Sequence, residues 1–450
     1  MHEWVKLSIR IGTFGFLKEF RPEDPYINQY LTGPTMNFTT QQVNQSVYPI
    51  ATYVSLFDLI LVFLLTDWLR YKPVIVCYAL CASIAQAILI WCRSLFAIQI
   101  MEVFYGTMIA CEVAYYTYIY AKVDPQHYQA VTSHMRAAAL IGRFVSGMTA
   151  QLLLIFGIMG VPELNHLSLA GMIASLIWSF CLPSIKHSLY FHRESESVPC
   201  NAIDNVENST HQQTDRVNTD LADTDSETNS KRKGVCHEAL SRLWRDFINA
   251  YTNKYVLKWS IWWALATCGY QQVMSYVQIL WDEIQGVSPT EDNVSYNGAI
   301  ESLYTIISAF SAFAFGRVQA DWSRPERGEL LLGVLTLLEG LALLWGAHCT
   351  RIWQAYLVYI IFGALYHVMM TISNSEVARH LESDCYALIF GVNTFVALLL
   401  QTVLTSAVAA QGGFMLPIRP QYVVYGSYFC ILGAIFLIKT FYSVTKSICR

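Results

Sequence analysis

Two carboxylates lie within one long apolar run of the chain, residues 95–121. Glu102 and Glu112 are ten residues apart in this run. Because each helical residue advances by about 100°, the two side chains point about 80° apart and can serve different partners. A charged group inside a membrane helix costs about 3 kcal/mol, so each of these residues is a candidate for a functional site.

Phenolic side chains bracket Glu112. Tyr105 precedes Glu112 by seven residues and Tyr115 follows it by three, so a helix places both near the same face. A carboxylate among aromatic faces suits an organic cation, through charge pairing and cation–π attraction. The structural alternative is that Glu112 pairs with Arg136 or Arg143 and holds two helices together. For Glu102, near one end of the run, the structural alternative is contact with water.

Neutral polar side chains recur in later apolar runs. Gln271, Gln272 and Gln278 lie in the run 257–281, which therefore suits the wall of a cavity. Asn297 opens the run 297–318, and Gln401 lies in the run 385–409. Amides bind ring nitrogens and amines without imposing charge. Their structural alternative is hydrogen bonding between helices.

The elements that must position these groups are the apolar runs themselves. The 450-residue chain is 54% hydrophobic and 14% charged, which is typical of membrane proteins and argues against a soluble enzyme or a nucleic-acid-binding protein. About 20 apolar helical residues cross a lipid bilayer. We predict an all-α membrane protein with twelve spans, at 4–19, 48–66, 73–91, 95–121, 136–159, 165–182, 257–281, 297–318, 329–347, 351–373, 385–409 and 421–443.

A polar segment divides these spans into two sets of six. Residues 201–233 contain almost no residues that form a core, so we predict a disordered cytoplasmic linker over 184–255. It separates an N-terminal six-helix half, 1–183, from a C-terminal half, 256–450. A D-W-x-R string follows the second span at 67–70 and the eighth at 321–324. This 6+6 arrangement is typical of transporters built from two halves around a central site.

Lysines and arginines set the predicted orientation. With the N-terminus inside, most basic residues of the connecting segments lie on the cytoplasmic side, which predicts cytoplasmic termini. Three N-x-[ST] sites, at Asn37, Asn44 and Asn293, then lie in outer loops and are candidates for glycosylation.

Motifs of catalysis and metal binding do not occur in the sequence. The 12 cysteines fall mostly in apolar runs without zinc spacing, and no nucleophile elbow, Walker loop or HExxH string is present. We therefore predict no enzyme activity, no metal site and no cofactor.

Several longer strings resemble the reduced folate carrier and thiamine transporter family, solute carrier family 19. They include GFLKEFRPEDPYINQYLTGP at 15–34, MEVFYGTMIACEVAYYTYIYAKVDPQHYQAVT at 101–132 and ALIFGVNTFVALLLQT at 387–402. The resemblance implies a major-facilitator fold in the plasma membrane that moves a water-soluble vitamin by alternating access. Its implied partners are the vitamin and the lipid bilayer, with no nucleic acid.

The resemblance also implies a preference between two vitamins. Folate carriers have basic residues where Glu112, Gly363 and Gln401 stand here, so the chain is closer to the thiamine members. By the same resemblance, Tyr48, Glu112, Tyr115 and Asn297 fall on positions that contact thiamine. Ala51 departs from the thiamine members, which have a tryptophan there. We predict a thiamine transporter; the alternatives are a folate carrier and a vitamin-binding receptor without transport.

Overall fold

The structure is a computed structural model of the chain, and it describes residues 3–119, 122–123, 127–185, 241, 244–245, 247–286, 295–316, 325–379 and 386–448. Every regular element in these ranges is helical, which confirms the predicted all-α class. The first six long helices are α1 (Glu3–Glu19), α4 (Tyr48–Trp68), α5 (Lys72–Trp91), α6 (Leu95–Thr117), α7 (Tyr128–Ile155) and α8 (Val161–Phe180). The later ones are α10 (Lys254–Gln285), α11 (Asn297–Gly316), α12 (Pro325–His348), α13 (Ile352–Arg379), α14 (Tyr386–Val408) and α15 (Ile418–Ile448).

Each predicted apolar run coincides with one of these long helices. The largest difference is at α7, which begins at Tyr128 and not at 136, because its first turns are helical but too polar for a hydropathy criterion. Short elements fill the connection between α1 and α4, namely η1 (Asp24–Tyr26), α2 (Ile27–Thr32), α3 (Thr40–Gln42) and η2 (Val43–Val47).

Eight helices of the described residues are long and apolar enough to cross a membrane. They are α4 to α7 and α12 to α15. The remaining long helices each carry a buried polar side chain: Lys18 in α1, Asn165 in α8, Gln272 in α10 and Asn297 in α11.

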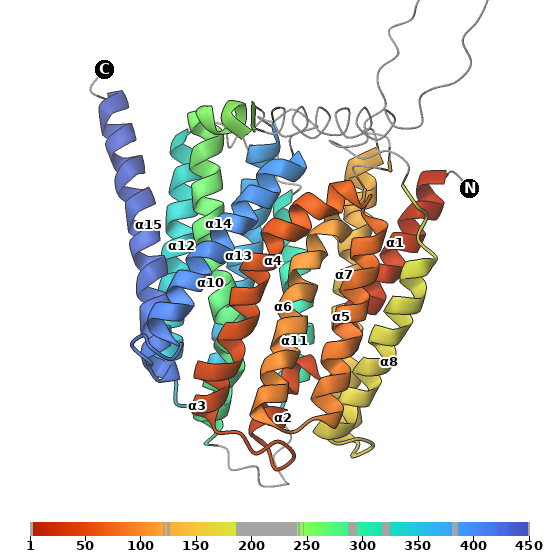
Figure 1. Cartoon of the computed structure of the whole chain (residues 1–450). Coiled ribbons are helices and arrows are strands. Elements are labelled where there is room, and N and C mark those ends of the chain that lie inside the picture. The colour runs from red at the N-terminus through yellow and green to blue at the C-terminus, as the bar shows by residue number, and fades with distance from the viewer. Residues whose placement is uncertain are drawn as a thin grey trace, which may run out of the picture.

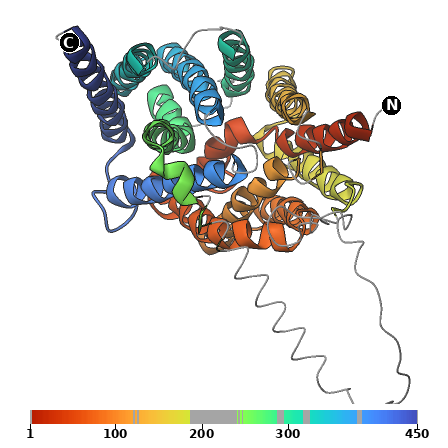
Figure 2. The same cartoon turned by 90° about the horizontal axis from the view of Figure 1, so that it is seen from above.

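The helices lie side by side in one bundle (Figure 1). The start of α1 and the end of α15 lie at the same end, and α2 and α3 lie at the other (Figure 1). Helices α1 and α4 to α8 pack mainly on one another, as do α10 to α15, and a view along the bundle shows these two groups beside each other (Figure 2). The second D-W-x-R string and most of the predicted linker lie outside the described residues.

Two helix pairs join the groups, α7 with α11 and α4 with α14. At the first pair, a Cβ on Gly147 would lie 2.5 Å from the Ser302 Oγ, and a Cβ on Gly298 would lie 2.7 Å from the Gly147 carbonyl oxygen. Only glycine permits this close backbone approach.

Candidate functional site

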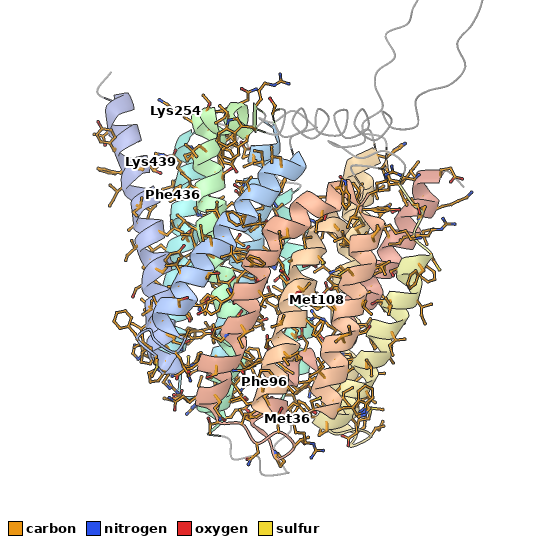
Figure 3. The ribbon with its side chains drawn as sticks, viewed as in Figure 1. Met36, Phe96, Met108, Lys254, Phe436 and Lys439 are labelled. Carbon is orange, nitrogen blue, oxygen red and sulfur yellow. The ribbon has the colours of Figure 1, made fainter. Side chains whose placement is uncertain are left out.

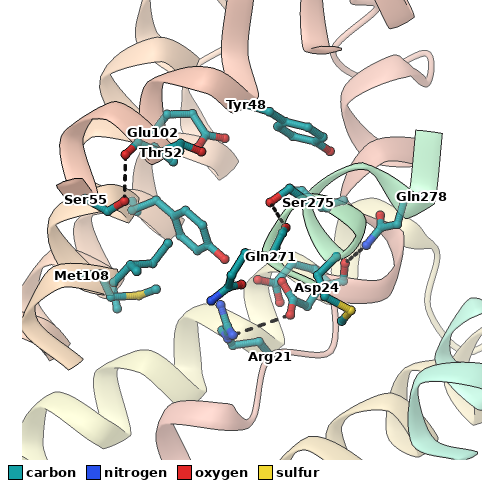
Figure 4. Close-up of a pocket in the computed structure, with 18 of the residues that line it drawn as sticks. Arg21, Asp24, Tyr48, Thr52, Ser55, Glu102, Met108, Gln271, Ser275 and Gln278 are labelled. Carbon is teal, nitrogen blue, oxygen red and sulfur yellow. Dashed lines mark hydrogen bonds and ion pairs between the residues drawn. The ribbon is translucent and has the colours of Figure 1, made fainter. Parts of the chain in front are cut away.

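A cavity of about 410 Å³ lies between the two helix groups. Figure 4 shows Tyr48, Thr52 and Glu102 on one wall and Gln271, Ser275 and Gln278 of α10 on the other. The first group also contributes most of the charged lining, namely Glu19, Arg21, Glu23, Asp24, Glu102, Glu112 and Arg143. The second contributes mainly neutral polar groups, among them Tyr270, Gln271, Gln278, Tyr359 and Gln401, together with Glu301.

The cavity reaches the middle of the bundle. Met108 of α6 is part of its lining, and this residue lies between Met36 at one end of the bundle and Lys254 at the other (Figure 3). A central position between two helix groups is the place where transporters built from two halves hold their substrates.

Five of the seven substrate-contact residues predicted from the sequence line this cavity. They are Tyr48, Glu102, Tyr105, Glu112 and Gln401. The other two, Tyr115 and Asn297, are each 1% exposed and lie outside the lining. The structure therefore brings together side chains from α4, α6 and α14 and places Tyr115 and Asn297 behind the wall.

Glu112 has a cationic partner that the sequence analysis did not predict. The Lys18 Nζ lies 2.6 Å from the Glu112 Oε1 and 2.5 Å from the Glu19 Oε1. Lys18 and Glu19 occupy the last turn of α1, where they interrupt the apolar pattern. That interruption was the signal that could have identified them, but the partner on α6 is 94 residues away in the chain.

Arg143 completes the network from α7. Both its Nε and one terminal nitrogen donate to the Glu19 Oε2, at 3.3 and 3.0 Å. The structural alternative predicted that Glu112 pairs with Arg136 or Arg143. In the structure, Glu112 pairs with Lys18, and Arg143 pairs with Glu19. The geometry favours Lys18 for Glu112 because α1 lies between α6 and α7 at this level.

Three tyrosine rings surround the Lys18 ammonium. Its Nζ lies 5.2 Å from the ring centre of Tyr115, 5.7 Å from that of Tyr78 and 5.9 Å from that of Tyr116. These distances fall within the range of cation–π attraction. Some of the aromatic rings expected around a substrate cation thus surround Lys18, a cation of the protein itself. Tyr115 is one of them, and its ring lies over the Lys18 ammonium.

Glu102 differs from Glu112 in its surroundings. Within the described part of the chain, its carboxylate has no hydrogen bond or ion pair, although its side chain is only 5% exposed and reaches the cavity. Tyr48, Tyr105 and Tyr276 lie near enough to interact with it electrostatically. Glu102 is therefore an acid without a neutralising partner next to phenolic rings.

Glu23 lies in the connection after α1, at the edge of the cavity. Its carboxylate bonds to the Ser168 hydroxyl of α8, and the side chain is buried. Burial, and next the neighbouring Asp24 charge, raise the pKa of Glu23 to about 8. This residue is therefore protonated at neutral pH and does not add to the negative charge of the cavity.

A latch joins the two groups at the end that holds α2 and α3, and we define it as residues 24–28 with their partners on α10 and α11. The Gln278 amide donates to the Asp24 carbonyl oxygen at 2.7 Å, and the Asn297 amide donates to the Pro25 carbonyl oxygen at 3.0 Å. Asn28 bonds to Asp282. Asn297 thus makes a structural hydrogen bond of the kind given as the alternative for the amides, and its contact with a substrate stays a prediction.

The predicted glycosylation sites have different surroundings. Asn37 is exposed. Asn44 is buried, and its side-chain oxygen accepts from the Gln421 amide at 3.3 Å, so this conformation leaves no room for a glycan there. Asn293 lies outside the described residues.

Gly363 on α13 has no space for a side chain. A Cβ at this position would lie 1.8 Å from the Tyr304 ring. The resemblance described above assigns a base to folate carriers at this position, and the packing around Gly363 leaves no room for its side chain.

Comparisons with known proteins agree on one family. Residues 2–424 match the sequence model of a family described as reduced folate carrier. Thiamine transporter 2 of Homo sapiens is 35% identical over 453 residues, covering 98% of this chain and 90% of that protein. Thiamine transporter 1 of Homo sapiens is 35% identical over 466 residues, covering 99% and 91%. The reduced folate transporter of Homo sapiens is 33% identical over 442 residues, covering 97% and 72%.

Solved structures share the fold at low identity. The nucleoside transporter NupG has a TM-score of 0.58 at 13% identity, covering 97% of this chain and 99% of that chain. The POT family transporter PepTSo has a TM-score of 0.62 at 11% identity, covering both chains fully, at 100% each. These proteins are transporters of the major-facilitator type, so the helices described above have that fold.

Proposed function

Because the chain belongs to the reduced folate carrier family, we propose that it is a vitamin transporter whose substrate is thiamine. A member of this family is a membrane transporter and not an enzyme. The curated relatives quoted above include thiamine transporters and a folate transporter, so the family alone leaves two substrates. The charge of the cavity supports thiamine over folate.

The observation that carries the proposal is the excess of acids over bases in the lining. Apart from the protonated Glu23, five carboxylates, Glu19, Asp24, Glu102, Glu112 and Glu301, face three bases, namely Arg21, Arg143 and the buried Lys18 behind the wall, so the acids exceed the bases by two. Arg143 is paired with Glu19, and Arg21 lies 3.6 Å from Asp24. Such a cavity attracts a cation and repels a dicarboxylate.

The chemistry of thiamine fits the two walls. Its thiazolium carries a permanent positive charge, which suits Glu102, Glu112 and the phenolic faces of Tyr48 and Tyr105. Its aminopyrimidine offers an amine and ring nitrogens, which suit amides such as Gln401 and Gln271 on the other wall. Tyr115 packs its ring against Lys18, the ion-pair partner of Glu112. Asn297 holds the latch beside the site through its hydrogen bond to Pro25.

The proposed mechanism is alternating access between two halves, 1–183 and 256–450, joined by the segment 184–255. All twelve long helices cross the plasma membrane in this proposal, and both termini are cytoplasmic. The latch then closes the outer end of the cavity, and substrate leaves toward the cytoplasm. Support comes from the major-facilitator fold, the common end of α1 and α15 and the lysine and arginine distribution.

The test is paired uptake of labelled thiamine and labelled folate in cells that lack other carriers for both. We expect uptake of thiamine and not of folate, and the Arg143→Ala variant serves as the comparison because Arg143 is the base most able to hold a folate carboxylate. Folate uptake by the parent that is lost in Arg143→Ala would overturn the thiamine assignment. Binding of thiamine without accumulation in liposomes would instead indicate a receptor.

A further inference from the structure

Lys18 is the one residue of the Glu112 network that does not line the cavity, although both of its acidic partners do. Its side chain is 0% exposed, whereas that of Glu112 is 32% exposed. The ammonium approaches Glu112 from behind and takes one carboxylate oxygen, Oε1. The cavity side of the same carboxylate remains open to a ligand.

We propose that Lys18 is a built-in competitor of the substrate cation at Glu112. The inference rests on the proposed function, because it requires that the substrate be a cation that Glu112 recognises. In the empty protein, Lys18 neutralises Glu112 at 2.6 Å. An entering cation must share the carboxylate with Lys18 or displace it, so part of the binding energy is spent on this exchange.

The geometry allows Lys18 to give up Glu112 without losing every partner. A buried ammonium needs at least one carboxylate. Glu19 lies 2.5 Å from the Lys18 Nζ and is held in place by Arg143 on its other oxygen. The rings of Tyr78 and Tyr115 also remain around the ammonium. The Lys18 ammonium can therefore remain paired with Glu19 when the substrate binds Glu112.

This competition affects selectivity as well as affinity. A neutral molecule of similar shape does not need the charge of Glu112 and is indifferent to Lys18. A cation gains from Glu112 only to the extent that it competes with a fixed ammonium already in place. Lys18 thereby lowers the affinity of the site for every cation that binds Glu112, and only cations with further favourable contacts bind tightly.

The experiment measures binding to the purified full-length protein with two probes, thiamine and its neutral pyrimidine half, 4-amino-5-hydroxymethyl-2-methylpyrimidine. In Lys18→Met, a neutral side chain of similar length, we expect the Kd of thiamine to fall at least about threefold, whereas the Kd of the neutral pyrimidine stays unchanged. The double variant Lys18→Met/Glu112→Gln should not show this tighter binding of thiamine, because the tighter binding depends on the free carboxylate of Glu112.

Lys258→Met is the matched control. Lys258 lies 2.6 Å from the Glu329 Oε1 and over the rings of Tyr255 and Trp259, so it has a carboxylate and aromatic partners as Lys18 does. It does not line the cavity, and its replacement should leave both Kd values as in the parent.

Each outcome has one meaning. An unchanged or raised Kd for thiamine in Lys18→Met, with thiamine still bound by the parent, would overturn the competition and make Lys18 a residue that positions Glu112. Absence of thiamine binding by the parent would instead overturn the proposed function. If Lys18→Met does not fold, Lys18→Gln takes its place under the same criteria.

Discussion

The two walls of the cavity differ in the kind of polarity they present. The wall from α1, the connection after α1, α6 and α7 carries seven acidic or basic side chains, and the wall from α10 to α15 carries one, Glu301. The second wall is otherwise lined by phenols, amides and apolar groups. In the proposed function, the first wall would thus recognise the charge of the substrate, and the second would supply mainly neutral hydrogen bonds and shape.

This division has a mechanical benefit. The ion pairs around the cavity, Lys18 with Glu112 and Glu19 and Arg143 with Glu19, lie within the first group of helices. Contacts between the groups, such as Asn297 with Pro25, are mostly neutral hydrogen bonds worth about 1 kcal/mol each. None of the salt bridges among the described residues joins the two groups, so in the proposed mechanism the halves would separate without breaking one, a loss that costs about 3 kcal/mol or more for a buried pair.

The comparison predicts that the largest effect follows from the charged wall. In Glu112→Gln we expect thiamine uptake to fall at least about tenfold, since the substrate loses its counter-charge and Lys18 loses one partner. Initial uptake rates, normalised to protein in the membrane, measure this effect. Uptake within about twofold of the parent would show that Glu112 is structural.

A smaller effect is expected at the second acid of that wall. Glu102→Gln should raise the KM for thiamine about fivefold, because an acid without a basic partner is replaced by an amide of the same shape. Binding of the neutral pyrimidine is the control and should not change. An equal loss for both probes would indicate a packing role.

The pH dependence of stability sharpens the comparison at the edge of the charged wall. Burial raises the pKa of Glu23 from 4.5 to about 8, so the folded protein binds this proton more tightly than the unfolded chain. The contribution of Glu23 to stability is therefore full below pH 4.5 and is lost as the pH rises through 8.

We expect the melting temperature of the parent to fall between pH 6 and pH 9, and that of Glu23→Gln to fall less. Parallel melting curves for the two proteins would contradict the protonated state of Glu23. Asp24, the charge next to Glu23, stays in place in both proteins.

The smallest effect is expected on the neutral wall. Gln401→Ala removes an amide that is 5% exposed and lines the cavity, so the KM for thiamine should rise by no more than about threefold. Uptake kinetics at several thiamine concentrations measure it. A loss as large as that of Glu112→Gln would remove the distinction between the two walls.

The sequence predicts the helices far better than it predicts the site. The run 48–66 matches α4 at Tyr48–Trp68 because hydropathy reports directly on burial in an apolar environment. Glu102 and Glu112 were found because an acid in an apolar run is conspicuous. Lys18 was missed as a partner because pairing across 94 residues depends on how α1 packs, which no local pattern reports. Asn297 has the chemistry of a ligand contact, but its depth in the bundle makes it part of the latch.

The crossing of α7 and α11 at Gly147 and Gly298 is a candidate pivot point between the two helix groups. The backbones of the two helices approach closely at these glycines, so in the proposed mechanism the helices would pivot at this crossing and stay in contact there. In the proposed alternating access, such a pivot would open one end of the cavity while it closes the other. A single methyl group at either glycine would fall within 2.7 Å of the facing helix. Such a substitution would push α7 and α11 apart and fix the angle at which they cross.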